Sequence, residues 1–182
     1  MKSYCVLYTK KRVSTALLFL FALFCICSQE IPKGYRSLQL GMSLDEAKTA
    51  LLDDSLFAYR GERDVSLLPS TEEYIIETEG SSFLSRCWFQ FYNNKLYIIT
   101  ITMNEQVIDY YSIFKTLLTK YGQPKSLSPN MVIWEDAKVR MSLERPLTVK
   151  YLDTDVYNSL LQSSQVDKSA VEMSRQKFLE SF

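Results

Sequence analysis

Histidine is absent from this chain of 182 residues, and glycine and proline occur only five times each. Without histidine the chain lacks the commonest general base, the commonest metal ligand, and any Ser-His or Cys-His nucleophile pair. The few glycines never take the spacing of a phosphate-binding loop. These absences argue against most hydrolases and against a nucleotide site. We therefore expect a protein that is not an enzyme and that holds no metal and no cofactor.

A clustered positive charge is also missing beyond the N-terminal segment. Lys+Arg and Asp+Glu both number 21, and four of the basic residues (Lys2, Lys10, Lys11 and Arg12) lie between Met1 and Ser28. The remainder therefore carries 21 − 4 = 17 basic against 21 acidic residues, a net charge of −4. Nucleic acids and anionic membrane surfaces attract basic clusters. The sequence thus argues against nucleic acid as a partner.

Cysteine is scarce in the same way. Cys5, Cys25 and Cys27 also lie in the segment that ends at Ser28, which leaves Cys87 alone in the rest of the chain. An intramolecular disulfide framework is therefore excluded once that segment is removed. Because Cys87 stands in an apolar run with Trp88 and Phe89, we expect a buried structural thiol rather than a reactive one.

The segment from Met1 to Ser28 has the pattern of a secretory signal peptide. The basic residues 10–12 precede an apolar stretch of twelve residues, 16–27. A bilayer span needs about 20 residues, whereas a signal h-region has about 7 to 15. Cleavage after Ser28 would release a chain that begins at Gln29. We expect an extracytoplasmic, periplasmic location.

Two alternatives to soluble export stay open, a lipoprotein signal and an uncleaved anchor. Lipidation would make Cys25 or Cys27 the first mature residue, but the residues before them, Phe24 and Ile26, do not fit a lipobox. Membrane association is therefore expected only if one of these cysteines is lipidated.

Local patterns predict three helices. The first begins at Ser43, which forms a capping box with Glu46 and precedes an apolar stripe. The second, Glu105 to Tyr121, ends at Gly122, with Pro124 two residues further on. Thr154 or Asp155 caps the third, and residues 166–182 follow as a helical tail.

Six strands are predicted between these helices. Alternating or aromatic and β-branched runs indicate them, and Asn93 to Lys95 is the turn of a hairpin. The runs are Tyr74 to Thr78, Cys87 to Tyr92, Leu96 to Met103, Met131 to Trp134, Val139 to Leu143 and Leu147 to Tyr151. The order is therefore α-βββ-α-βββ-α. It predicts an α+β fold in which an antiparallel sheet of about six strands carries helices packed on one face.

The organisation that follows is one domain after the signal peptide. Residues 1–28 form the signal, 29–165 the domain and 166–182 the tail. The domain consists of two loosely similar α-βββ halves, about 40–104 and 105–152.

The helix-flanking phrases Leu40 to Ser43 (with Glu46, Ala47 and Leu51) and Tyr121 to Pro124 resemble the small outer-membrane assembly lipoproteins of the BamE (SmpA/OmlA) type. The tandem-repeat fold of β-lactamase inhibitor protein consists of copies of a unit similar to those domains. This resemblance covers only the two helix-flanking phrases. It implies a domain that binds other proteins through its sheet face and its loops.

The candidate binding residues fall into two groups. The long loop Ser55 to Glu72 is either a solvated connector or a binding loop with Tyr59, Arg60 and Arg63 as its contacts. Trp88, Tyr97 and Trp134 are core residues, or an aromatic platform if they share a face. The acidic pairs are expected to be solvated surface.

Two functions are compatible with these patterns. The leading one is a non-catalytic, exported protein-interaction module that binds another envelope protein and serves envelope assembly or maintenance. The alternative is a protein that binds a small ligand or an envelope polymer in an aromatic-lined pocket.

Export predicts a defined mature end. The intact mass of the protein purified from its native envelope should correspond to a chain that begins at Gln29 without lipid, because cleavage after Ser28 fits the residues best. A mass that includes acyl chains on Cys25 or Cys27 would instead show a lipoprotein.

Overall fold

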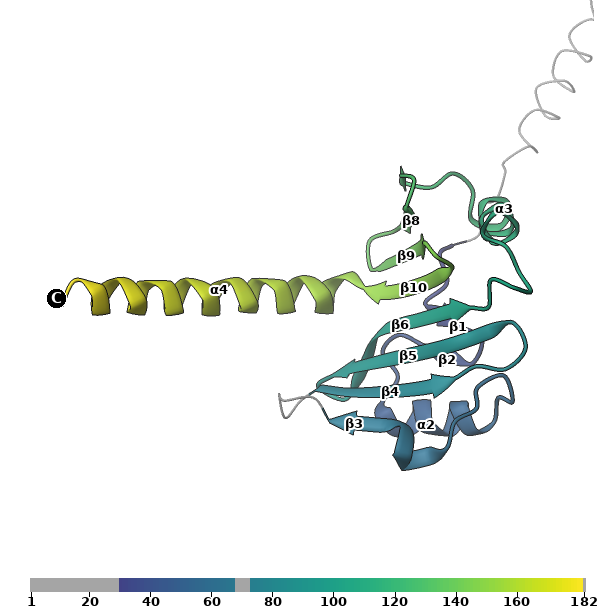
Figure 1. The fold of residues 1–182 in the computed structure, drawn as a ribbon, viewed down its shortest axis with the longest axis horizontal. Coiled ribbons are helices and arrows are strands. Elements are labelled where there is room, and N and C mark those ends of the chain that lie inside the picture. Colours follow the sequence, from purple (N-terminus) through teal and green to yellow (C-terminus); the bar gives the residue numbers. More distant parts are fainter. Residues whose placement is uncertain (1–29, 68–72, 182) are drawn as a thin grey trace, which may run out of the picture.

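An eight-stranded antiparallel sheet dominates the structure (Figure 1). The computed structural model describes residues 30–67 and 73–181, and for 165–172 it describes the helix but not the side chains. The strand order is β3-β4-β5-β6-β10-β9-β8-β7, and β1 and β2 form a separate two-stranded sheet. The elements are β1 (Gly34–Tyr35), β2 (Leu38–Gln39), α2 (Leu44–Leu52), the 3-10 helix η1 (Gly61–Asp64), β3 (Val65–Leu67), β4 (Glu73–Glu79), β5 (Leu84–Tyr92), β6 (Lys95–Met103), α3 (Tyr110–Tyr121), β7 (Ser126–Leu127), β8 (Met131–Glu135), β9 (Val139–Glu144), β10 (Thr148–Asp153) and α4 (Thr154–Leu179).

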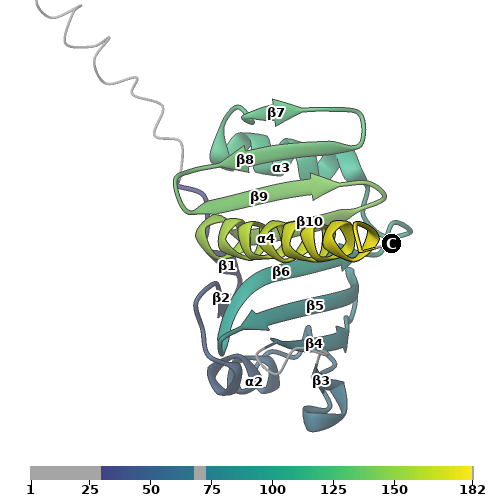
Figure 2. The same cartoon turned by 90° about the vertical axis from the view of Figure 1, so that its left-hand side faces the viewer.

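The large sheet consists of two four-stranded meanders joined at its centre. In each half a helix comes first, and four antiparallel strands then follow one another across the sheet. The last strands of the two halves, β6 and β10, pair antiparallel from Ile98↔Leu152 to Thr102↔Thr148. This pairing makes one continuous sheet with β3 and β7 at its two edges (Figure 2).

The predicted sheet of about six strands in the order α-βββ-α-βββ-α is wrong. The sheet has eight strands, and each half contributes four instead of three. The extra strands β3 and β7 have three and two residues, and the β1–β2 hairpin before α2 has two-residue strands. Alternation cannot be recognised in segments this short, since the pattern needs about four to eight residues.

The placement of all helices on one face is also wrong. Side chains of α2 and α3 join the main hydrophobic core with one face of the sheet, whereas Val156, Tyr157 and Leu160 of α4 pack with Tyr97, Ile98 and Leu152 in a second cluster. Figure 2 shows α4 in front of the sheet and α3 behind β8. We call the face with α2 and α3 the core face, and the opposite face the open face.

Capping and stop signals in the sequence set the helix ends. The Ser43–Glu46 capping box is present at the start of α2, as predicted. Gly122, with φ of 73°, ends α3, and its N–H donates to Leu118 O. A positive φ favours glycine because a Cβ atom would clash there. The other ends differ from prediction, since Asp109 caps α3 and Asp153 caps α4.

The β5–β6 hairpin is the longest pairing in the sheet and was predicted from its turn. Asn93 and Asn94 both have positive φ, at 48° and 56°. Asparagine tolerates this conformation, which the tight turns between twisted strands need. The hairpin prediction is confirmed.

The segment predicted as a long loop, Ser55 to Glu72, is partly structured. Phe57 forms a bridge to Gly80, and the segment continues through η1 into the edge strand β3. Its last residues, 68–72, lie outside the described part of the chain, and so does the predicted signal peptide.

Cys87 is fully buried in the core, and this burial predicts how its thiol reacts. Desolvation raises the pKa of its thiol to about 12 from an ordinary value of 9.0. In a chain that begins at Gln29, where Cys87 is the only cysteine, it should react with a thiol reagent only after unfolding. Reaction in the native state at the rate of a free thiol would contradict this.

The raised pKa of the Cys87 thiol also predicts that the protein loses stability as pH rises. Between pH 9 and pH 12 the unfolded chain releases the thiol proton while the folded chain keeps it, so the free energy of unfolding falls as pH rises. Cys87→Ala should show a shallower fall over this window in urea unfolding. If the free energy of unfolding falls equally steeply with pH for wild type and Cys87→Ala, the thiol does not cause the loss of stability.

Candidate functional site

Strand register builds the open face as three rows of side chains that cross the sheet. Neighbouring strands place alternate residues on the same face, so the paired residues can be followed from β4 to β8. The first row is Ile75, Gln90, Ile98, Leu152, Arg140 and Glu135; the second is Glu77, Trp88, Thr100, Lys150, Ser142 and Ile133; the third is Glu79, Arg86, Thr102, Thr148, Glu144 and Met131. The face therefore mixes apolar side chains with charges of both signs.

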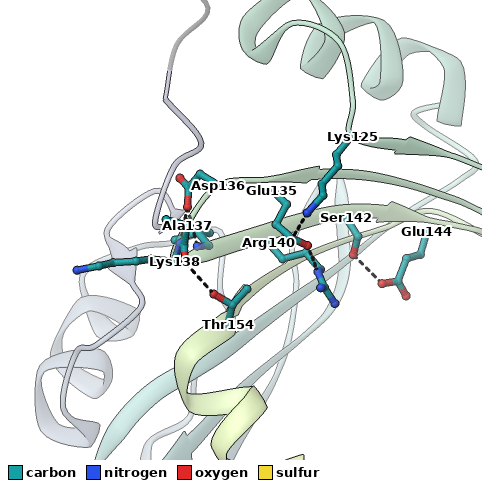
Figure 3. Close-up of polar contacts among 10 residues, drawn as sticks. Lys125, Glu135, Asp136, Ala137, Lys138, Arg140, Ser142, Glu144 and Thr154 are labelled. Carbon is teal, nitrogen blue, oxygen red and sulfur yellow. Dashed lines mark hydrogen bonds and ion pairs between the residues drawn. The ribbon is translucent and has the colours of Figure 1, made fainter.

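Charges on the half of the open face formed by β8 to β10 are paired with one another (Figure 3). Glu135 accepts from Lys125 Nζ at 2.6 Å and from Arg140 Nε at 2.5 Å. The hydrogen bonds from Lys125 and Arg140 hold the pKa of Glu135 below its ordinary value. This carboxylate stays ionised between two cations.

A second pairing lies beside the first. Ser142 is buried, and its hydroxyl donates to Glu144 Oε1 at 2.7 Å. Lys150 Nζ lies 3.2 Å from the same oxygen. The carboxylate of Glu144 is therefore shared between a hydroxyl from its own strand and an ammonium from β10.

The β8–β9 turn attaches to the first residue of α4. Asp136 Oδ1 accepts from the backbone N–H groups of Lys138 and Val139, both at 2.8 Å. Thr154 donates its N–H to Lys138 O at 2.9 Å and its hydroxyl to Ala137 O at 3.4 Å. Figure 3 shows the hydroxyl contact with the turn. These bonds fix where α4 leaves the sheet.

A groove of about 260 Å³ lies at the base of α4 on the open face. Its walls are side chains of five strands and of the first turn of α4. They are Gln90, Ile98, Met131, Ile133, Arg140, Ser142, Glu144, Lys150, Leu152 and Tyr157. We call it the α4 groove. Apolar side chains line it together with the paired charges described above.

Trp88 lies on the other half of the open face, formed by β4 to β6. It is half-buried, and the guanidinium of Arg86 lies 6.0 Å from the centre of its ring. Arg86 Nη1 also lies 3.1 Å from Glu77 Oε1. Thr100 stands next to Trp88 on β6. We call these four residues the Trp88 patch.

The predicted aromatic platform is divided between the two faces. Trp134 is buried on the core face, where its ring packs on Phe114 and its Nε1 donates to Gly122 O at 2.9 Å. Tyr97 is buried on the open face, at a bulge of the β5–β6 ladder, against α4. Of the three predicted aromatic residues, Trp88 remains the one that presents a partly exposed ring.

Two of the three loop residues that were predicted to bind a partner contact other parts of this protein instead. Arg60 donates to the carboxylate of Asp64 through Nη2 at 2.7 Å, through Nε at 2.9 Å and through its backbone N–H at 2.8 Å. The Asp64 side chain has no exposed surface. Tyr59 packs against the core, where burial raises its pKa. Arg63 is exposed.

Sequence reasoning missed most of the open-face residues, although a signal for some was present. The alternation of Arg140, Ser142 and Glu144 against Val139, Met141 and Leu143 places the polar set on one face. That they form a groove depends on Tyr157 and on the distant strands β5 and β6, which no local pattern reveals.

Two further hollows are wide and open to solvent. One, of about 550 Å³, lies between the segment around Ile31, the end of α3 and the β8–β9 turn. The other, of about 580 Å³, lies along α2. Tyr121 and Trp134 line the first, but Trp134 is only 2% exposed and offers little surface for stacking. Among the described residues, no group of three His, Cys, Asp or Glu side chains is placed to hold a metal ion.

The fold and this site define a class of protein: a two-halved antiparallel sheet with one face covered by helices and the other presenting mixed side chains beside a long helix. The chain belongs to the TP0088 domain family, which matches residues 33–163. No curated protein and no solved structure matched it, so the resemblance to BamE-type domains stays a prediction. No described helix has the length and apolarity to cross a bilayer.

The Glu135 ion pairs predict a measurable contribution to stability. Glu135→Gln should lower the free energy of unfolding by about 1 kcal/mol at pH 7, a modest value because both cations are partly exposed. Since its pKa is lowered in the folded state, the contribution is present above the ordinary value of 4.5 and is lost as pH falls through the folded pKa.

Urea unfolding at pH 7 and below pH 4 would test this. The difference between wild type and Glu135→Gln should shrink at the lower pH. Glu105→Gln, at an exposed position in the β6–α3 loop, is the matched control and should unfold like the wild type at both. A difference for Glu135→Gln that does not depend on pH would rule out the electrostatic origin.

Proposed function

We propose that this protein is an exported, non-catalytic interaction module that docks another envelope protein on the open face of its sheet. The observation that carries the proposal is the Trp88 patch, in which an aromatic ring and a guanidinium lie on the part of the open face formed by β4 to β6, outside the cluster that packs against α4. Tryptophan and arginine are over-represented among the residues that dominate interface energies.

The surroundings of the patch fit a protein partner. Thr100 and Thr102 lie on β6 opposite Trp88 and Arg86, and their short polar side chains can form hydrogen bonds without large losses of side-chain entropy. The Glu77–Arg86 pair is half exposed on both sides. A partner with an apolar centre and its own charges at the rim could cover Trp88 and exchange this ion pair for contacts across the interface.

The place of action follows from the sequence prediction of a signal peptide. The partner would be an extracytoplasmic protein, and the net charge of −4 after Ser28 disfavours nucleic acid and anionic lipid surfaces. Association with the membrane is proposed only for the case in which Cys25 or Cys27 is lipidated. The proposed role needs neither a cofactor nor a catalytic residue.

The structure favours this function over a pocket for a small ligand. A ligand binder typically encloses its ligand in a concavity of about 300 to 1,000 Å³ with apolar and aromatic walls. The larger described hollows are open and contain many charged residues, and the α4 groove is smaller.

Crosslinking in cells followed by purification of the tagged protein would test the proposal. Wild type should recover a saturable protein partner, and Trp88→Ala combined with Arg86→Glu should reduce the recovery at least tenfold. The matched control is Lys115→Glu with Thr119→Ala on the exposed side of α3, behind the sheet, which should leave the recovery unchanged.

Thermal unfolding of each variant would separate lost contacts from lost structure. Recovery of the same partner by the folded Trp88 variant would contradict docking at the patch. Arg63→Glu tests the loop separately and without disturbing the buried carboxylate of Asp64. If only Arg63→Glu reduces recovery of the partner, the binding site lies on the loop and not on the open face.

A further inference from the structure

Arg140 lines the α4 groove, and its guanidinium is only partly used within the protein. Its Nε donates to Glu135 Oε2 at 2.5 Å, whereas its terminal nitrogens Nη1 and Nη2 donate to no described residue. Figure 3 shows these two nitrogens pointing away from Glu135. The side chain is 40% exposed, so a ligand can reach it. Because a guanidinium presents its donors in a fixed fork that matches a carboxylate, Arg140 can bind a second carboxylate while it keeps the first.

The ion pairs around the groove leave one positive charge uncompensated. Glu135 is shared by Lys125 and Arg140, and Glu144 is paired with Lys150. Three cations and two carboxylates give 3 − 2 = +1. Covering paired charges costs desolvation energy, so an occupant without a charge of its own gains little here. An occupant with one negative charge neutralises the site.

The carboxylate of Glu144 does not oppose such an occupant. Arg140 and Glu144 lie four residues apart on the same face of β9, which separates their backbones by about 13 Å. Both oxygens of Glu144 lie close to Lys150 Nζ, at 3.2 and 3.3 Å, and Ser142 donates to one of them. The positive end of the groove is therefore at Arg140, and the neutralised end is at Glu144.

Apolar side chains line the space between these two ends. Ile133 and Met131 reach it from β8, the first partly exposed and the second 37% exposed. Ile98 and Leu152 form the opposite wall and are nearly covered, because α4 packs on them. In the β8–β9 pairing Ile133 is the diagonal neighbour of Arg140, and such neighbours are about 7–8 Å apart. One amino-acid residue spans this distance between its carboxylate and the end of a long apolar side chain.

The size of the groove and its closed side favour the end of a chain. Its volume of about 260 Å³ equals roughly nine water molecules at about 30 Å³ each, which is room for one residue with its carboxylate. Tyr157 in the first turn of α4 closes one side, and Thr154 fixes this turn to Lys138 O and Ala137 O. An internal acidic residue would need the chain to continue on both sides, and α4 blocks one of them.

We propose that the α4 groove binds the carboxy-terminal residue of another protein. The terminal carboxylate lies on Nη1 and Nη2 of Arg140, and an apolar side chain of the size of leucine packs against Ile133 and Met131. The paired hydrogen bonds fix the direction of the chain end, and the apolar contact selects its last residue.

This inference goes beyond the docking proposed for the Trp88 patch and does not rest on it. The walls of the α4 groove come mainly from β8, β9, β10 and α4, whereas the Trp88 patch belongs to β4, β5 and β6. The groove takes a chain end, while the patch takes a folded surface.

Titration of the isotope-labelled exported protein with an N-acetylated tetrapeptide that ends in leucine, followed by NMR, would test the proposal. The amide signals of Ser142 and its neighbours should shift and saturate, with a dissociation constant of about 1 mM or tighter. The same peptide with a carboxy-terminal amide should bind at least tenfold more weakly, because hydrogen bonds to a charged group are lost. A peptide that ends in glycine should also bind more weakly, since it lacks the apolar side chain.

Variants of the groove separate the two contacts. Arg140→Gln should weaken binding at least tenfold, and Arg140→Lys, which keeps the charge but loses the fork, should weaken it as well. Lys125→Gln is the matched control, because Lys125 also pairs with Glu135 but does not line the groove and is 63% exposed. Its effect should stay below about threefold, since solvent and salt screen such a charge. Ile133→Ala should weaken binding of the leucine peptide but not of the glycine peptide.

Three outcomes would overturn the proposal: equal binding of the acid and amide peptides, equal effects of Arg140→Gln and Lys125→Gln, or binding of free isocaproate as tight as that of the peptide. The last would identify a site for a small carboxylic acid instead of a chain end. Thermal unfolding confirms that each variant is folded. Failure here would leave docking at the Trp88 patch untouched, since that test measures capture through a different surface. Failure of partner capture would likewise leave the peptide titration unchanged.

Discussion

The antiparallel pairing of β6 with β10 holds this structure together. Each half of the chain is a helix followed by a four-stranded meander, and a meander packed on a single helix buries little apolar surface. Pairing the last strand of one half with the last strand of the other joins the two cores into one. It also decides which strands stand at the edges and where α4, the continuation of β10, leaves the sheet.

Local signals in the sequence predicted some ends of elements correctly. The capping box at Ser43, the glycine at 122 and the two asparagines at 93 and 94 each act within a few residues, so their effects are independent of the rest of the fold. The short strands β1, β2, β3 and β7 carry no such signal. β3 and β7 are strands because the longer neighbours β4 and β8 offer them hydrogen bonds, whereas β1 and β2 pair with each other. The pairing partner is not encoded within so short a segment.

The candidate site was predictable only in part, for a related reason. Trp88 and Trp134 occupy similar aromatic runs, yet one is half-buried on the open face and the other is buried under Phe114. Their faces follow from the register between strands of different halves, which is set by the β6–β10 pair. Nor could the sequence show that α4 packs on the face opposite α2 and α3, since periodicity reveals an apolar stripe but not the surface that it covers.

The two halves have the same order of elements, but their open faces differ. On β4 to β6 an aromatic ring and its cation are partly exposed, a surface that loses water readily. On β8 to β10 the carboxylates of Glu135 and Glu144 are held by neighbouring cations and a hydroxyl. A surface of paired charges attracts few partners, because each group must be desolvated again when it is covered. The repeated architecture thus gives one sheet two surfaces of different chemistry, with the base of α4 between them.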